Sequence, residues 1–197
     1  MNWLGLHKRQ SRHRYATQLW DREYPEEPWD RLGRLNDLAH FSVLGGYFRS
    51  LVPAGGSLLD VGCGEGLLLP HVACHAGRYL GIDVEVAVQL AIKRRQVLSP
   101  GAEFRAADMN QFVPSERFDA IAFCESIYYL DDRVRLHEYL KALKPQGVLL
   151  VSCQSRSSHD VIWEDLETIC ESIDSVQVVN GSVAWNVRAM RPKGFAA

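Results

Sequence analysis

The chain has 197 residues, of which 47% are hydrophobic and 23% are charged, and its formal net charge at pH 7 is −2. This length fits one domain with a sizeable core, and the near-neutral charge excludes a generally basic surface for nucleic acid. The apolar runs are too short for a membrane span, so we expect no membrane partner. The five cysteines form no Cys-x-x-Cys pair and the histidines lack metal-site spacing, which favours a cytoplasmic location and predicts no metal site.

The N-terminal segment differs in composition from the rest of the chain. Residues 1–14 contain four basic side chains and no acidic one, and residues 1–35 mix tryptophan and tyrosine with charged residues. Pro25 and Pro28 interrupt this segment, so we expect short helices that form an arm or lid on the remaining domain, residues 36–197. The alternative is a surface arm whose aromatic side chains simply pack on the body.

From residue 36 onward, apolar spacing predicts alternating helices and strands. Steps of three and four over residues 36–51 are typical of an amphipathic helix. The later predictions are strands at 57–61, 79–82, 103–106, 118–123 and 148–153, and helices near 67–76, 85–98, 131–143 and 159–173. Such alternation implies right-handed crossovers and a mostly parallel sheet covered on both faces. Asn180 and Gly181 predict a turn between antiparallel strands at 176–179 and 183–189.

The first predicted strand leads into three glycines at alternate positions, Gly62, Gly64 and Gly66. Glycines at this point let the backbone turn sharply and approach a ligand at the edge of the sheet. Leu67 stands where the third glycine of a dinucleotide motif belongs, which disfavours a pyrophosphate ligand and a nicotinamide-dependent oxidoreductase. The spacing favours a ligand without phosphate, such as an adenosine with a short polar chain. The simpler alternative is a tight structural turn.

Acidic residues follow the next two predicted strands. Asp83 ends the second strand, where it can accept hydrogen bonds from both hydroxyls of a ribose or can begin a helix as its N-cap. Asp108 follows the third strand, where its carboxylate can accept a hydrogen bond from an exocyclic amine while the next backbone N–H donates to a ring nitrogen. The alternative for Asp108 is a helix start with the cap at Asn110. We favour ligand binding for both carboxylates.

These features occur in an order that resembles the class I, Rossmann-like S-adenosylmethionine-dependent methyltransferases. The resemblance covers about residues 36–190 and rests on the segment 60–66, Asp83, Asp108, the strand at 118–123 and the turn at 143–147. It implies a doubly wound α/β fold whose mostly parallel, seven-stranded sheet has the order 3-2-1-4-5-7-6, with strand 7 antiparallel and helices on both faces. It also implies S-adenosyl-L-methionine as the cofactor.

The same resemblance, carried over by position, assigns residues to parts of the cofactor. The glycine loop would hold the methionine part, the second strand end the ribose, the third strand end the adenine, and the fourth strand end would approach the amino group. The implied cofactor-binding residues are Asp60, Gly62, Cys63, Gly64, Gly66, Asp83, Val84, Asp108, Met109 and Cys124. Two short segments, 25–30 and 125–130, are in addition similar to the nodulation-factor N-methyltransferase branch.

Candidates for the chemistry follow the fourth and fifth strands, namely Glu125, Tyr128 and His159. Methyl transfer from a sulfonium is a direct in-line displacement, so the enzyme mainly aligns the reactants and a base is needed only for a protonated acceptor. Imidazole suits that role because it titrates near neutrality. In the alternative interpretation, Ser157 or Ser158 caps the next helix with His159 in its first turn, and Tyr128 packs in the core.

Other methyltransferase chemistries lack their motifs. Cys124 lies between phenylalanine and glutamate rather than after proline, which disfavours a covalent RNA cytosine mechanism and favours a small buried hydrophobe. The Pro-Pro-aromatic tetrad used on amines of bases is missing, so we expect no nucleic-acid partner. The prediction is a methyltransferase for a small-molecule acceptor, with nitrogen favoured over oxygen. The alternative is a non-catalytic S-adenosylmethionine-binding regulatory protein or pseudo-methyltransferase.

Overall fold

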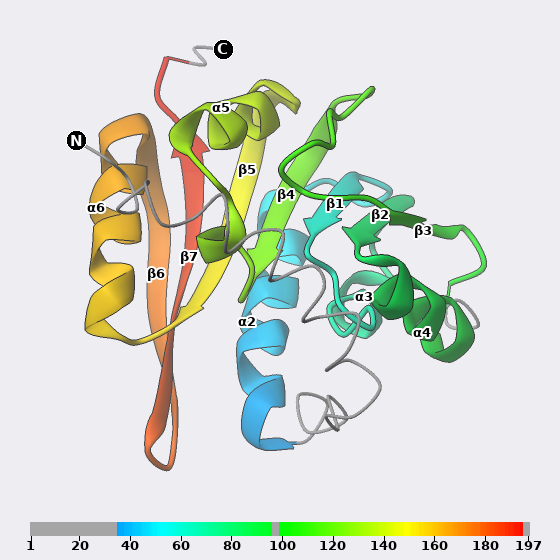
Figure 1. Ribbon diagram of the computed structural model, residues 1–197, viewed down its shortest axis with the longest axis horizontal. Coiled ribbons are helices and arrows are strands. Elements are labelled where there is room, and N and C mark those ends of the chain that lie inside the picture. Colours follow the sequence, from blue (N-terminus) through cyan, green and yellow to red (C-terminus); the bar gives the residue numbers. More distant parts are fainter. Residues whose placement is uncertain (1–34, 96–98, 195–197) are drawn as a thin grey trace.

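The computed structural model describes residues 35–95 and 99–194. The expected N-terminal arm therefore lies, apart from its last residue, outside the described residues, as does the similarity at residues 25–30. The described part forms one sheet (Figure 1) of seven strands in the order β3-β2-β1-β4-β5-β7-β6. The strands are β1 Ser57–Val61, β2 Arg78–Asp83, β3 Ala102–Ala106, β4 Phe118–Cys124, β5 Leu143–Gln154, β6 Cys170–Asn180 and β7 Val183–Pro192.

The strand pairing confirms the predicted fold class. Strand β1 pairs in parallel with β2 and with β4, and the same direction continues to β3 and to β5. Strand β7 runs antiparallel to both β5 and β6. The carboxyl ends of β1 to β5 consequently lie at one edge of the sheet, which is where an open α/β sheet binds its ligands.

Helices cover both faces of the sheet. Their bounds are α2 Leu35–Leu51, α3 Leu69–Val72, α4 Glu85–Arg95, α5 Arg133–Lys141 and α6 Asp160–Ile169, with short 3-10 helices η4 Ile127–Tyr129 and η5 Ser157–His159. Side chains of α5 and α6 share one buried apolar cluster with the sheet, and side chains of α2, α3 and α4 share the other. The central strands β1 and β4 are mostly apolar because both of their faces are buried, whereas most residues of the edge strand β6 are exposed. Within the described residues, none of the helices combines the length and apolarity that crossing a membrane requires.

Two predicted helices are shorter in the structure than their apolar spacing suggested. The helix predicted near 159–173 ends at Ile169, because Cys170 pairs with Pro192 and starts β6. Apolar residues at Cys170 and Ile173 fit a helical period, but pairing with β7 overrides that local pattern. The helix predicted near 67–76 is reduced to Leu69–Val72, since the chain turns back at once towards β2.

The predicted C-terminal hairpin is confirmed, although its strands are longer than expected. Asn180 pairs with Val183 across the turn, and Gly181 has the left-handed φ of 58° that such a turn requires. The hairpin adds β7 and β6 to the end of the sheet and does not contribute to the edge where β1 to β4 end.

Two neighbouring glycines of α2 predict opposite effects on stability. A Cβ atom at Gly45 would lie 2.6 Å from the Cβ of His71 and 2.8 Å from its carbonyl oxygen, whereas Gly46 has no such neighbour within 4 Å. We expect Gly45→Ala to lower the free energy of unfolding by about 1–3 kcal/mol through overpacking. Gly46→Ala should raise it by about 0.5–1 kcal/mol, because alanine favours the helix. Urea unfolding measures the free energy of unfolding of both variants. Equal changes in the two would contradict the close packing of α2 on α3.

Candidate functional site

The loop that follows β1 is held in left-handed backbone conformations. Gly62, Gly64 and Gly66 have φ values of 72°, 54° and 72°, which residues with side chains rarely adopt. The N–H groups of Gly62 and Cys63 donate to the carbonyl oxygen of Ile82 on β2, at N···O distances of 2.9 and 3.1 Å. The loop therefore turns sharply at the carboxyl edge of the sheet and stays bonded to the neighbouring strand.

The loop after β4 packs directly on Gly62. A Cβ atom at Gly62 would lie 2.5 Å from the Cβ of Ser126 and 3.3 Å from the Cε of Met109. The Ser126 hydroxyl donates to the carbonyl oxygen of Val61 at 2.5 Å. Glycine is required here by close packing as well as by backbone conformation, and the loops after β1, β3 and β4 meet at this point.

Asp83, at the end of β2, is bonded to the glycine loop. Its Oδ2 accepts from the N–H of Gly64 at 2.7 Å, and its Oδ1 accepts from the N–H of Val84 at 2.7 Å. Burial raises the pKa of Asp83, while these two backbone hydrogen bonds act in the opposite direction. Each carboxylate oxygen has a second lone pair, so the side chain can order the loop and still accept hydrogen bonds from a ligand.

The chain after β3 makes a tight turn around Asp108. Its Oδ1 accepts from the N–H of Asn110 at 2.9 Å, and its Oδ2 accepts from the side-chain amide of Gln111 at 3.1 Å. These bonds are typical of an aspartate that organises a turn. The hydroxyl of Tyr139 on α5 fixes the same segment by donating to the carbonyl oxygen of Met109 at 2.8 Å.

Asn110 has a role that sequence reasoning missed, since it was considered there only as a helix cap. Its Nδ2 donates to the carbonyl oxygen of Tyr129 at 3.0 Å, and its Oδ1 accepts from the N–H of Asp131 at 2.7 Å. The side chain is buried. Asn110 thus joins the turn after β3 to the segment after β4. No spacing in the sequence indicates this contact, because its partners are backbone groups about twenty residues away.

Asp60, near the end of β1, is almost completely buried. It is 1% exposed, and its Oδ2 accepts from the hydroxyl of Tyr79 on β2 at 2.6 Å. Its Oδ1 has no hydrogen-bond partner within residues 35–95 and 99–194. Burial raises the pKa of Asp60 to about 7, the Tyr79 hydrogen bond opposes this shift, and the charge of Asp83 adds to it.

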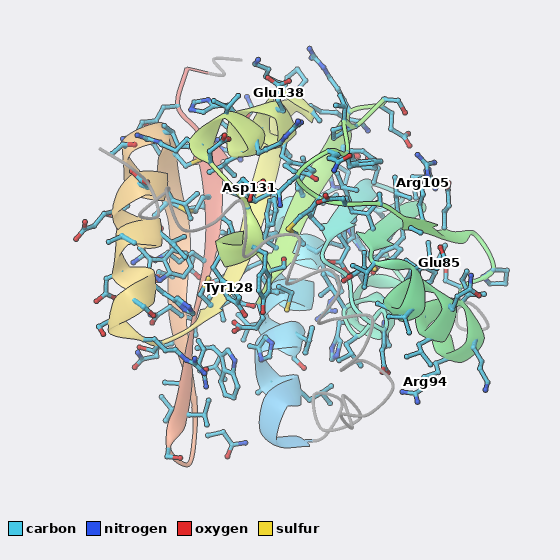
Figure 2. All side chains as sticks on the ribbon, viewed as in Figure 1. Glu85, Arg94, Arg105, Tyr128, Asp131 and Glu138 are labelled. Atoms are coloured by element: carbon cyan, nitrogen blue, oxygen red, sulfur yellow. The ribbon has the colours of Figure 1, made fainter. Side chains whose placement is uncertain are left out.

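Glu65 is a second residue that sequence reasoning did not single out. It lies between the last two glycines of the loop, its side chain is only 6% exposed, and it forms an ion pair with Arg94 of α4. Figure 2 labels Arg94 on this helix, which lies beside the glycine loop. The pair ties the loop to α4, and only the three-dimensional structure identifies the arginine involved.

The three predicted catalytic candidates come together at the ends of β4 and β5. Glu125 has a φ of 55° and its N–H donates to the carbonyl oxygen of Ser152 at 3.0 Å. The hydroxyl of Tyr128, labelled in Figure 2, lies 3.5 Å from Oε2 of Glu125. The Tyr128 ring stacks on the ring of His159, with centroids 4.7 Å apart and planes 13° from parallel, and its other ring neighbour is Tyr129 at 4.6 Å. A left-handed backbone at a non-glycine residue, as at Glu125, occurs most often at functional sites.

The start of α6 differs from the alternative that places Ser157 or Ser158 as its cap. The helix begins at Asp160, His159 occupies the N-cap position, and no side chain caps it. The Nδ1 atom of His159 instead lies 2.9 Å from the carbonyl oxygen of Gln154 at the end of β5.

The cysteines near the site are buried and unreactive. Cys63, Cys124 and Cys153 are all buried, and desolvation raises the pKa of each thiol well above its ordinary value. Cys124 also accepts a hydrogen bond from the hydroxyl of Ser152. A thiol with a raised pKa is a poor nucleophile, so these side chains act as small apolar groups.

Comparison with known proteins finds a family match for the central segment and a solved structure with the same fold. Residues 59–151 match a family model described as a methyltransferase domain. The crystal structure of the N-methyltransferase NodS from Bradyrhizobium japonicum WM9, in complex with S-adenosyl-L-homocysteine, aligns with a TM-score of 0.73 at 23% identity. The alignment covers 90% of this chain and 98% of that one. The two chains share one fold.

Curated relatives match parts of their own length. The ubiquinone biosynthesis O-methyltransferase of Bradyrhizobium diazoefficiens is 30% identical over an alignment of 147 residues that covers 66% of this chain and 58% of that protein. An N,N-dimethyltransferase of Streptomyces fradiae, named for dTDP-3-amino-3,6-dideoxy-alpha-D-glucopyranose, is 36% identical over 104 residues, 50% of this chain and 40% of that protein. The chain thus spans about half the length of these relatives.

The buried carboxyl group of Asp60 predicts a pH dependence of stability. Its pKa is higher in the folded protein than the ordinary 3.8, so folding takes up a proton between about pH 4 and pH 7. The stabilising contribution is therefore complete below this range and is lost as the pH rises through it. Asp60→Asn keeps an acceptor for Tyr79 but cannot ionise. We expect the variant to be more stable than the wild type by about 1–3 kcal/mol at pH 8.

Urea unfolding between pH 4 and pH 8 measures this difference. We expect the free energy of unfolding of the wild type to decline towards pH 8, and that of the Asp60→Asn variant to decline much less. A wild type whose free energy of unfolding stays constant over the range would contradict the assignment of a raised pKa to Asp60.

Proposed function

We propose that this chain, whose residues 59–151 match a methyltransferase domain and which shares the fold of NodS, transfers a methyl group from S-adenosyl-L-methionine to a nitrogen atom of a small molecule. The observation that carries the proposal is the hydrogen bond from the N–H of Gly64 to the carboxylate of Asp83. It joins a glycine-rich loop to a hydrogen-bond acceptor at the carboxyl edge of the sheet, which is the arrangement an adenosine ligand needs.

The residues at this edge fit the proposed cofactor. The left-handed backbone at Gly62 and Gly64 leaves no side chain between the loop and a ligand. Asp83 supplies acceptors for two ribose hydroxyls, and Asp108 with Met109 lies on the adenine side. Leu67 replaces the third glycine that a pyrophosphate requires, and it is buried. When bound, the cofactor supplies a methyl group already activated by a sulfonium, so the protein needs no covalent intermediate.

The role proposed for this chain's residues is to bind the acceptor and to orient it. Ser126 packs on Gly62, and its neighbour Glu125 begins the segment that faces the acceptor. Tyr128 and His159 form the stacked pair beside Glu125. Correct alignment of two reactants contributes about 7–11 kcal/mol to lowering a barrier, so rigid placement of this segment is the main requirement.

Nitrogen is favoured as the acceptor because of the groups that surround the proposed position. The carboxylate of Glu125 next to two tyrosine rings suits a cationic amine better than a neutral hydroxyl. The names of the two relatives include both an O-methyltransferase and an N,N-dimethyltransferase, and both act on small molecules by name. We therefore propose a small amine as the substrate class.

Two further parts of the proposal concern the surroundings of the site. Residues 1–35 are proposed as a lid, on the basis of their aromatic and basic composition. A cytoplasmic location is proposed because the five cysteines are unpaired and four of them are buried.

Calorimetric titration with S-adenosyl-L-homocysteine tests the cofactor assignment. We expect binding to the wild type, and a dissociation constant roughly 10-fold to 100-fold higher for Asp83→Ala, because charged acceptors of ligand hydroxyls are lost. Glu85→Ala is the matched control, since Glu85 lies two residues away on the exposed side of α4. Its dissociation constant should stay within about twofold of the wild-type value. No binding at millimolar ligand, or equal binding by Asp83→Ala, would refute the assignment.

A further inference from the structure

The hydrogen bond of His159 fixes the position of the proton on its imidazole. Its Nδ1 lies 2.9 Å from the carbonyl oxygen of Gln154. A carbonyl oxygen can only accept a hydrogen bond, so Nδ1 carries the hydrogen. In the neutral ring, Nε2 then has the lone pair, and it lies on the side of the ring away from Gln154. Among the described residues, Nε2 has no hydrogen-bond partner.

The ring is also fixed in orientation. It stacks on Tyr128, which belongs to η4 after β4, while its own Nδ1 is bonded to the end of β5. The contact therefore joins the segments after two neighbouring strands. His159 stands at the N-cap position of α6 without capping it, so the start of the helix does not account for the placement of the imidazole.

Tyr128 and Glu125, which lie beside His159, are engaged in a hydrogen bond with each other. Burial, followed by the negative charge of Glu125, raises the pKa of Tyr128 far above its ordinary value, so its phenol stays protonated and can donate to Glu125. The carboxylate of Glu125 is engaged by that hydroxyl and supplies negative charge. The positive charge of Arg156 opposes the rise in the pKa of Tyr129 that burial causes. Of these groups, His159 alone combines a ring fixed by two contacts with a nitrogen lone pair that no described residue uses.

We propose that Nε2 of His159 takes the proton from an acceptor amine that arrives as an ammonium ion. This inference rests on the proposed methyltransferase function and adds the route of the proton. The carboxylate of Glu125 and the exposed ring of Tyr129 hold the cation, and the imidazole, stacked on Tyr128, accepts one of its protons through a charge-assisted hydrogen bond.

The step balances in atoms and charge. Transfer of one proton to His159 leaves a neutral amine with a lone pair on nitrogen. That lone pair forms the new bond to the methyl carbon as the carbon–sulfur bond breaks, and the electron pair of the broken bond remains on sulfur. The positive charge moves from sulfur to the methylated nitrogen, and His159 then releases its proton to solvent.

Nuclear magnetic resonance of the protein with ¹⁵N-labelled histidine tests this proposal without requiring turnover. Spectra of the S-adenosyl-L-homocysteine complex at about pH 8, where an ordinary imidazole is neutral, show which ring nitrogen carries hydrogen. The His159 signals are assigned by their contact with the Tyr128 ring and by His159→Phe, which keeps a ring for stacking. His137→Phe, on the exposed side of α5, is the matched control.

Three probes then separate the possible modes of binding. Benzylammonium has N–H donors, benzyltrimethylammonium has the charge without them, and benzyl alcohol has a donor without the charge. We expect hydrogen on Nδ1 of His159, and a shift of the Nε2 signal with benzylammonium that the other two probes do not reproduce. His159→Phe should weaken benzylammonium binding roughly 10-fold to 100-fold, as expected for one charge-assisted hydrogen bond, and His137→Phe should not.

Hydrogen on Nε2, or an Nε2 signal that benzylammonium leaves unchanged, would overturn the inference. The wild-type spectra decide this even if His159→Phe does not fold. Calorimetry on the same sample distinguishes the two levels of the account. A wild type that binds S-adenosyl-L-homocysteine but gives either contrary spectrum refutes only the role of His159, whereas failure to bind it refutes the proposed function as well.

Discussion

The hydrogen bond between the N–H of Gly64 and the carboxylate of Asp83 is the constraint on which the rest of the site depends. It connects the glycine loop, in which three of five residues lack a side chain, to the end of the neighbouring strand. Together with the bonds from Gly62 and Cys63 to the carbonyl oxygen of Ile82, it selects the left-handed turns of the loop over other conformations. The acceptor that orders the loop is also the group that we propose as the ribose-binding residue.

Close packing extends this constraint to the acceptor side. Ser126 lies against Gly62 and bonds to the carbonyl oxygen of Val61, so the segment after β4 is positioned by the loop after β1. Asn110 then joins the turn after β3 to the same segment. Each contact is local, yet together they place the proposed adenine, methionine and acceptor positions at fixed distances from one another. That rigidity is what an alignment mechanism requires.

Much of this architecture could be predicted from the sequence, because it depends on patterns that repeat along the chain. Alternating strands and helices predicted a mostly parallel sheet, and the glycine spacing after β1 predicted the position of the glycine loop. The strand order was implied by the resemblance to class I methyltransferases, and Asn180 with Gly181 predicted the final hairpin. The predicted end of the helix α6 was wrong, because Cys170 and Ile173 fit a helical period and only pairing with β7 decides their structure. The roles of Asn110 and of the Glu65–Arg94 pair depend on contacts between distant segments, for which a single sequence has no signal.

A crystal structure of the complex with S-adenosyl-L-homocysteine is the most direct test of the central claim. The account predicts that the ribose hydroxyls lie within hydrogen-bonding distance of Asp83, with the sulfur atom facing the segment of Glu125, Tyr128 and His159. A ligand bound elsewhere, or a ribose that does not contact Asp83, would contradict it.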